Sequence, residues 1–104
     1  MNKVNINGKD YGVRFSIKAM IEFEKSTGTK ITSLKGGADE LSINEVIELC
    51  YAALKDGARK NKTKLKRSED KDWLIDEISD NPNLLPEILN AFKDSTATKK
   101  KKRT

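Results

Sequence analysis

Residues 41–57 have the sequence LSINEVIELCYAALKDG, which contains the clearest helix start in the chain. Ser42 and Glu45 have the spacing of a capping box, in which each side chain binds the backbone N–H of the other residue. Leu41 and Val46 have the spacing of a hydrophobic staple around that cap. Gly57 is typical of the residue that follows a helix. The pattern therefore predicts a helix over 43–56 that ends before this glycine.

The apolar side chains of 43–56 fall on one broad arc of the helix, which predicts that this helix lies at the centre of the core. The arc comprises Ile43, Val46, Ile47, Leu49, Cys50, Tyr51, Ala53 and Leu54. The polar side comprises Asn44, Glu45, Glu48, Lys55 and Asp56. Because Cys50 lies in the middle of the arc, we interpret it as a buried structural thiol rather than a reactive one.

Two short alternating segments lie upstream, and Asn7-Gly8 separates them. This dipeptide favours a type I′ turn, in which both central residues have positive φ, so the pattern predicts a β-hairpin. A two-residue loop would pair Val4 with Tyr11, and a four-residue loop over 7–10 would pair Ile6 with Tyr11. Either register places the same apolar residues on one face, which must pack against the helices. These are Val4, Ile6, Tyr11, Val13 and Phe15.

Ser16 and Gly28 bracket a predicted helix over 17–27, as its N-cap and as the residue that follows it. Its apolar arc comprises Ala19, Met20, Phe23, Ile17 and Ile21. Glu24 falls inside this arc, where its carboxylate either reaches water or needs a buried partner such as a lysine or a backbone amide. Residues 29–40 are predicted to form a loop, with Ile31 and Leu34 directed inward.

The C-terminal half predicts two further helices. Ser68 can cap the first, whose stripe is Leu74, Ile75 and Ile78. Asn83 can cap the second, with Pro86 in its first turn and a stripe of Leu84, Leu85, Ile88, Leu89, Ala91 and Phe92. The predicted fold class is mainly α (α+β), with an N-terminal β-hairpin packed on a bundle of about four helices. We expect one domain over 1–94 and a disordered basic tail over 95–104.

Many of the positive charges are concentrated in two short runs of the sequence. The chain has 21 Lys and Arg residues and 16 Asp and Glu residues, a formal net charge of +5. The run Lys99–Arg103 supplies five positive charges, so the net charge of residues 1–98 is zero. A second run, 59–67, has the sequence RKNKTKLKR and contains no acidic residue. These runs would suit phosphate contacts, but neither contains aromatic residues for base stacking, so nucleic-acid binding is the less favoured interpretation.

The sequence excludes much of hydrolytic enzymology. It has no histidine and one cysteine, so it lacks the usual nucleophile–histidine pairs, an intrachain disulfide and a multi-cysteine metal site. No phosphate-binding loop or nucleophile elbow occurs, and no apolar run suggests a signal peptide or a membrane span. We expect no enzyme activity, no cofactor and no metal. The acidic residues Glu69, Asp70, Asp72, Asp76, Glu77 and Asp80 are expected along the exposed side of one helix.

Trp73 lies at or beyond the edge of the stripe of its predicted helix. We interpret it as covering the rim of the core under the hairpin, and the alternative is that it anchors a partner protein. Four residues at or beside apolar faces are candidate partner contacts. They are Phe23, Glu24, Tyr51 and Trp73.

Five segments, in this order, carry a resemblance to a known family. They are VNINGKDY at 4–11, RFSIKA at 14–19, FEKSTG at 23–28, LS at 41–42 and IELCYAAL at 47–54. Over about residues 3–94 the chain resembles the small tail assembly chaperones of long-tailed bacteriophages and related prophages. The resemblance rests on pattern and order rather than on a catalytic signature.

The resemblance implies a non-enzymatic protein in the cytoplasm of a bacterial host, absent from the mature virion. It would bind the tape measure protein and help recruit the tail tube protein, and it could form a homo-oligomer along its client. Two alternatives remain open. One is a structural head–tail connector or tail completion protein, which would stay in the particle. The other is a small nucleic-acid-binding accessory protein that uses the two basic runs.

Overall fold

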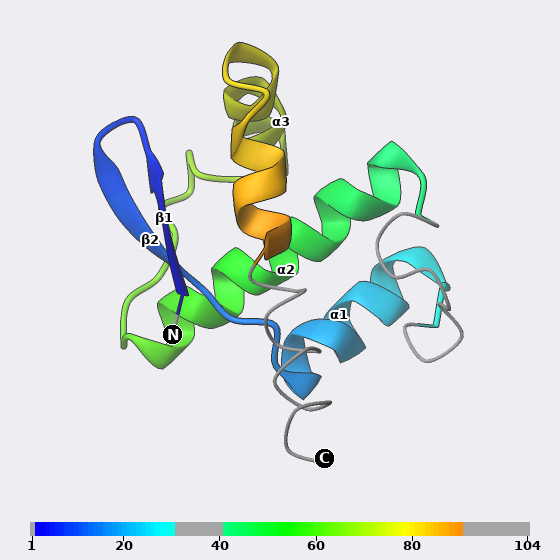
Figure 1. Cartoon of the computed structure of the whole chain (residues 1–104). Coiled ribbons are helices and arrows are strands. Elements are labelled where there is room, and N and C mark those ends of the chain that lie inside the picture. The colour runs from blue at the N-terminus through cyan, green and yellow to red at the C-terminus, as the bar shows by residue number, and fades with distance from the viewer. Residues whose placement is uncertain (1, 31–40, 91–104) are drawn as a thin grey trace, which may run out of the picture.

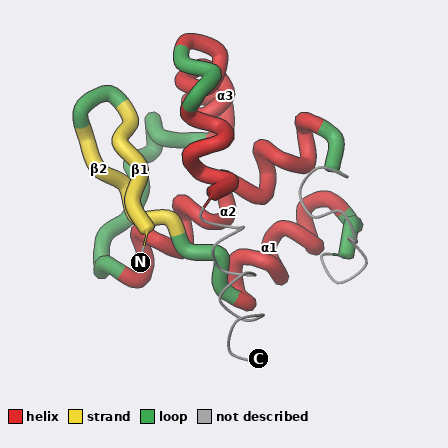
Figure 2. Tube along the Cα trace, viewed as in Figure 1, coloured by secondary structure: helices red, strands yellow, loops and turns green. Residues whose placement is uncertain are grey.

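Helix α2, Ile43–Lys60, runs through the middle of the molecule, and the other elements pack around it (Figure 1). The computed structural model describes residues 2–30 and 41–90. The hairpin consists of β1, Asn2–Ile6, and β2, Lys9–Val13. Helices α1, Ile17–Thr27, and α3, Lys71–Asp80, lie on opposite sides of α2, and residues 84–90 form a further helix (Figure 2). The predicted α+β architecture of a hairpin on helices is confirmed.

The hairpin has the register of the two-residue loop. Val4 pairs with Tyr11, and the turn residues Asn7 and Gly8 have φ values of 56° and 84°. Glycine adopts such angles without strain and asparagine tolerates them, which explains this dipeptide in a type I′ turn. Of the predicted apolar face, Tyr11 is half-buried and the other four residues are buried, namely Val4, Ile6, Val13 and Phe15.

Helix α1 begins and ends as predicted. The Ser16 hydroxyl accepts a hydrogen bond from the Ala19 N–H at 3.2 Å, and Gly28, at φ 76°, donates its N–H to the Glu24 carbonyl at 2.7 Å. The predicted apolar arc is too wide, however. Ile17 is 75% exposed and Ile21 is 46% exposed. The helix packs against α2 through a narrower stripe in which Ala19 and Phe23 are buried.

The predicted end of the second helix is wrong, because α2 continues through Gly57 to Lys60. Its C-cap is Asn61, whose N–H donates to the Gly57 carbonyl at 3.1 Å. A Cβ atom on Gly57 would lie 2.1 Å from the Gly12 carbonyl oxygen, so this glycine lets the helix touch the backbone of β2. The capping box of Ser42 and Glu45 is confirmed.

Two residues of α2 also differ from the predicted faces. Ile43, the first residue of the helix, lies on the predicted core arc but is 66% exposed. Asp56 was placed on the polar side but is only 4% exposed. Cys50 is fully buried, as predicted.

Helix α3 begins later than predicted. Asp70, not Ser68, is the N-cap, and its carboxylate accepts a hydrogen bond from the Trp73 N–H at 2.9 Å. Ser68 is exposed and lies in a turn that precedes the helix. Leu74 is fully buried, whereas Ile75 is 39% exposed.

The last described helix, over 84–90, agrees with the predicted start. Asn83 precedes it and accepts a hydrogen bond from the Glu87 N–H at 3.3 Å through its carbonyl oxygen. Leu84 and Ile88 are buried in the core. The predictions for Ile31, Leu34, Ala91, Phe92 and the tail over 95–104 lie outside the described residues.

The core joins the hairpin to all the described helices. Its buried cluster comprises Val4, Ile6, Val13, Phe15, Phe23, Val46, Ile47, Leu49, Cys50, Ala53, Leu54, Leu74, Leu84 and Ile88. None of the described helices is both long and apolar enough to cross a membrane.

Candidate functional site

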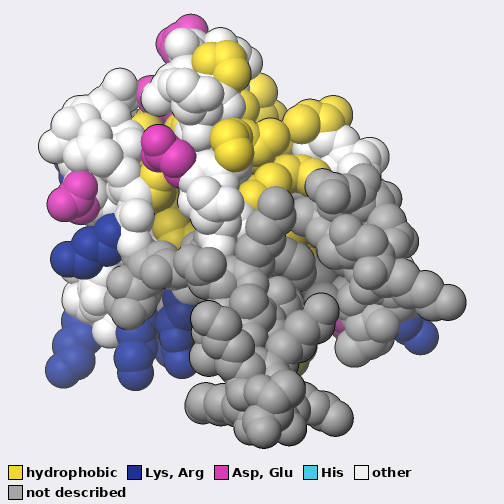
Figure 3. All heavy atoms as spheres, viewed as in Figure 1, with side chains coloured by type: hydrophobic (Ala, Val, Ile, Leu, Met, Phe, Trp, Pro, Cys, Tyr) yellow, Lys and Arg dark blue, Asp and Glu magenta, His cyan; other side chains and the backbone are white. Residues whose placement is uncertain are grey.

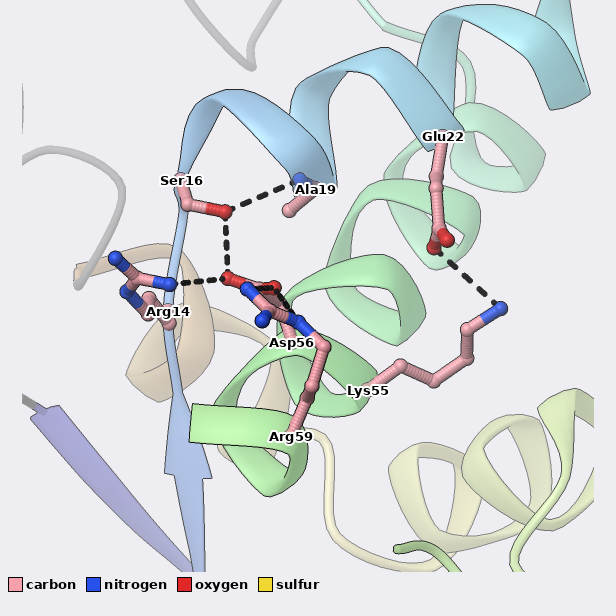
Figure 4. A network of polar contacts seen from close by, with 7 residues as sticks. All are labelled: Arg14, Ser16, Ala19, Glu22, Lys55, Asp56 and Arg59. Carbon is pink, nitrogen blue, oxygen red and sulfur yellow. Dashed lines mark hydrogen bonds and ion pairs between the residues drawn. The ribbon is translucent and has the colours of Figure 1, made fainter. Parts of the chain in front are cut away.

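Asp56 is a buried carboxylate at the end of α2 that ties three elements together (Figure 4). It accepts hydrogen bonds from the Ser16 hydroxyl, from Arg14 at 3.2 Å and from the Arg59 Nη2 at 2.7 Å. Nearby, the Arg14 N–H donates to the Ala53 carbonyl at 3.1 Å. The carboxylate therefore fixes the junction between β2 and α1 onto α2.

The charge of Asp56 is maintained by these partners. Burial is the largest effect on its pKa and raises it, but the hydrogen bonds from Ser16 and Arg59 oppose burial. The positive charges of Arg59 and Arg14 add to those bonds, and the net effect lowers the pKa below its ordinary value. Asp56 is thus an ionised, fully engaged structural group at neutral pH, with no oxygen left for acid–base chemistry.

Glu69 is the second buried carboxylate, and the prediction that it lies on an exposed helix face is wrong. It precedes α3 and accepts hydrogen bonds from the Tyr11 hydroxyl and from the Lys66 N–H, the latter at 2.7 Å. The Lys9 ammonium lies 3.8 Å away. Glu69 thereby joins the hairpin to the segment between α2 and α3.

The Tyr11 hydrogen bond and the Lys66 N–H lower the pKa of Glu69 in spite of its burial. Burial, followed by the bond to Glu69, raises the pKa of Tyr11 to about 12. Neither Asp56 nor Glu69 was selected by sequence reasoning. A signal existed for Asp56, since Arg59 follows it by three residues on a helix, a spacing that brings side chains together. Nothing local marked Glu69, whose partner Tyr11 lies 58 residues away.

The C-terminal end of α2 and the segment that follows it form a basic surface. A cavity of about 480 Å³ opens there, lined by Tyr51, Lys55, Arg59, Lys62, Thr63, Lys64 and Leu65. We call Lys55, Arg59, Lys62 and Lys64 the basic surface. Figure 3 shows Lys and Arg side chains gathered at the end of the molecule where α2 ends, with acidic side chains nearer α3 and the hairpin.

The four cations of the basic surface differ in what they contact. Lys55 lies 3.5 Å from the Glu22 carboxylate and 5.4 Å from the centre of the Tyr51 ring. Arg59 is paired with Asp56. Lys62 and Lys64 are exposed and form no ion pair with any described residue. The surface therefore offers positive charge to an external anion.

Two of the predicted contact residues, Tyr51 and Trp73, contact the backbone of Glu69 and its partner Tyr11 respectively. The Tyr51 hydroxyl donates to the Glu69 carbonyl at 3.5 Å. Trp73 is half-buried and lies against Tyr11, with ring centroids 5.5 Å apart. This position agrees with Trp73 covering the core rim beside the hairpin. A role of either residue in partner binding stays a prediction.

The other two predicted contact residues lie on α1. Phe23 is fully buried in the core, so its ring offers no surface to a partner in this conformation. Glu24 is half-buried on the next position of the helix. Their proposed contacts also stay predictions.

The described residues contain no cluster of three or more acidic or cysteine side chains that could hold a metal ion. Burial raises the pKa of the Cys50 thiol to about 12, so it is neutral at physiological pH. Comparisons with protein-family models, with curated proteins and with solved structures found no match.

Proposed function

We propose that this protein is a non-enzymatic tail assembly chaperone of a long-tailed bacteriophage or prophage. It binds the tape measure protein in the host cytoplasm and aids assembly of the tail tube. The proposal starts from the resemblance over residues 3–94, which rests on the order of the hairpin and helix motifs.

One observation carries the proposal furthest. Ile17 and Ile21 are both exposed, and they are four residues apart, so they lie on the same side of α1. Their apolar side chains remain in water even though the core contains enough apolar material to enclose Phe23 completely. An amphipathic helix of a client protein could cover such a face through its own apolar stripe. We therefore assign client binding to this face of α1.

The test is co-expression with the tape measure protein encoded in the same genome, followed by co-purification at low and high salt. A double variant, Ile17→Ser with Ile21→Ser, removes the apolar face. The matched control, Lys18→Ser with Lys25→Ser, changes two exposed residues of the same helix. We expect the wild type and the control to retain the client at high salt, because apolar contacts are not screened, and the double variant to lose it.

Two outcomes would contradict the proposal. One is a client whose solubility does not change when this chain is co-expressed and that does not co-purify with it. The other is retention of the chain in purified virions, measured by mass spectrometry. That result would favour a connector or completion protein.

A further inference from the structure

The surface of the segment 59–67 carries positive charge only. Six cations occur in it, and all six are exposed: Arg59, Lys60, Lys62, Lys64, Lys66 and Arg67. The nearest carboxylates in the sequence, Asp56 and Glu69, are both buried and engaged by internal partners. Because these two acids face inward, they do not neutralise the exposed cations by direct pairing at the surface, except at Arg59.

Five of the six cations, Lys60, Lys62, Lys64, Lys66 and Arg67, form no ion pair with a described residue. Neighbouring like charges repel one another, and this repulsion lowers the stability of the folded chain. A polyanion that binds along the segment would remove the repulsion and release its own counterions. The charge distribution therefore favours an extended anionic partner over a single small anion.

The composition of the surface indicates which polyanion it suits. Interfaces with proteins are depleted in lysine and enriched in aromatic residues at their centre, whereas this segment is rich in lysine. Of the two apolar residues that line the cavity, Leu65 is half-buried and the Tyr51 ring is covered by Lys55. Contacts with phosphate groups need only such lysine and arginine side chains.

We infer that the segment 59–67, together with Lys55, binds the sugar–phosphate backbone of nucleic acid without sequence preference. The inference does not depend on the proposed chaperone function, because it uses the end of α2 and the segment after it rather than the apolar face of α1. Little base stacking is available at the cavity, since the Tyr51 hydroxyl also donates to the Glu69 carbonyl. Affinity is therefore electrostatic and falls steeply with salt.

The test measures the affinity of the full chain for a labelled 20-nucleotide single-stranded RNA and for a 20-base-pair DNA duplex. Fluorescence anisotropy is recorded at several salt concentrations. The triple variant Lys60→Gln, Lys62→Gln and Lys64→Gln removes three exposed charges of the segment. The matched control, Lys3→Gln, Lys18→Gln and Lys25→Gln, removes three exposed charges elsewhere. The C-terminal basic run is unchanged in all chains and contributes equally to each.

We expect the control to bind as the wild type does. For single-stranded RNA, loss of three phosphate contacts reduces the slope of log K against log salt by about 2. It weakens binding about a hundredfold at 0.1 M salt and very little near 1 M. With the DNA duplex, loss of the same three contacts reduces the slope by about 2.7, because each contact releases more counterions from a duplex. Tighter binding of the duplex than of the single strand at equal salt would identify double-stranded nucleic acid as the preferred source of phosphates. Far-UV circular dichroism confirms that both variants are folded.

Three results would overturn the inference. The first is unchanged binding in the triple variant. The second is an equal loss of affinity in the control, which would show that affinity depends on the net charge of the chain rather than on this surface. The third is polyglutamate that displaces the oligonucleotide at an equal concentration of charges, which would indicate an acidic protein as the partner.

Discussion

Gly57 is the residue at which α2 and β2 come into backbone contact. The apolar arc of α2 ends close to it, and a glycine there is typical of a helix end, so the sequence suggested a cap. The structure instead uses the absence of a side chain to let the helix approach the Gly12 carbonyl. A local pattern could not reveal this, because the contacting strand lies more than forty residues earlier in the chain.

Substitution Gly57→Ala tests this close approach. In an exposed helix interior the same change stabilises a protein by about 1 kcal/mol through helix propensity. Here the added Cβ would lie 2.1 Å from backbone oxygen, so the hairpin and the helix must move apart. We expect a destabilisation of about 1–3 kcal/mol, typical of overpacking, in urea unfolding. A variant as stable as the wild type would contradict the close contact.

The burial of the two carboxylates of the candidate site also depends on contacts between distant segments of the chain. Sequence reasoning placed Asp56 and Glu69 on solvated faces because charged residues are seldom buried without partners. Their partners Arg14, Ser16 and Tyr11 lie in the hairpin and the start of α1, far away in sequence. The spacing of Asp56 and Arg59 on one helix is a local signal for the first of these residues, but the contacts with the hairpin and the start of α1 appear only in the tertiary structure.

At the scale of elements, the boundaries set by local chemistry were predictable. The Asn7-Gly8 turn, the Ser16 and Gly28 caps of α1 and the capping box of α2 use only neighbouring residues, and all were predicted. Which apolar side chains are buried was less predictable. Ile17, Ile21 and Ile43 lie on apolar arcs and are exposed, because the packing partner covers only part of each arc.

The start of α3 offers a test between two neighbouring capping residues. Substitution Asp70→Ala removes the acceptor of the Trp73 N–H and a negative charge near the positive end of the helix. We expect a loss of about 1 kcal/mol in urea unfolding. The matched control is Ser68→Ala, at the exposed position that the sequence suggested as the cap. Its effect should stay within about 0.5 kcal/mol, as for other surface substitutions. A larger loss of stability for Ser68→Ala than for Asp70→Ala would instead identify Ser68 as the N-cap.

For the molecule as a whole, buried and capped carboxylates determine how stability depends on pH. The pKa values of Asp56 and Glu69 are lowered in the folded state, and so is that of Glu45, chiefly by its hydrogen bond from Thr29. A lowered folded-state pKa adds stability that is complete above the unfolded value, near 4 for these groups, and is lost below it. We expect the free energy of unfolding to be flat from about pH 7 to pH 5 and to fall at lower pH.

Tyr11 makes the stability of the folded chain fall at high pH rather than at low pH. Its folded-state pKa of about 12 exceeds the ordinary value of 10, so its contribution is complete below pH 10 and is lost as the pH rises toward 12. Urea unfolding across pH 3–11 measures both limbs. The variant Asp56→Asn should reduce the acid slope. Tyr11→Phe should reduce the alkaline slope and leave the part that comes from the buried Cys50 thiol, whose pKa is also raised. Unchanged slopes in both variants would exclude these two groups as the cause.

Chemical labelling of the single thiol, Cys50, can measure how often the core opens. The chain has one cysteine, and its side chain is fully buried with a pKa of about 12. A thiol reagent can therefore react only during an opening of the core, when the sulfur meets solvent and ionises normally. When closing is faster than reaction, the ratio of the observed labelling rate to that of a free cysteine equals the fraction of time the core spends open. The folded protein thus contains its own reporter of rare conformational fluctuations, without any introduced probe.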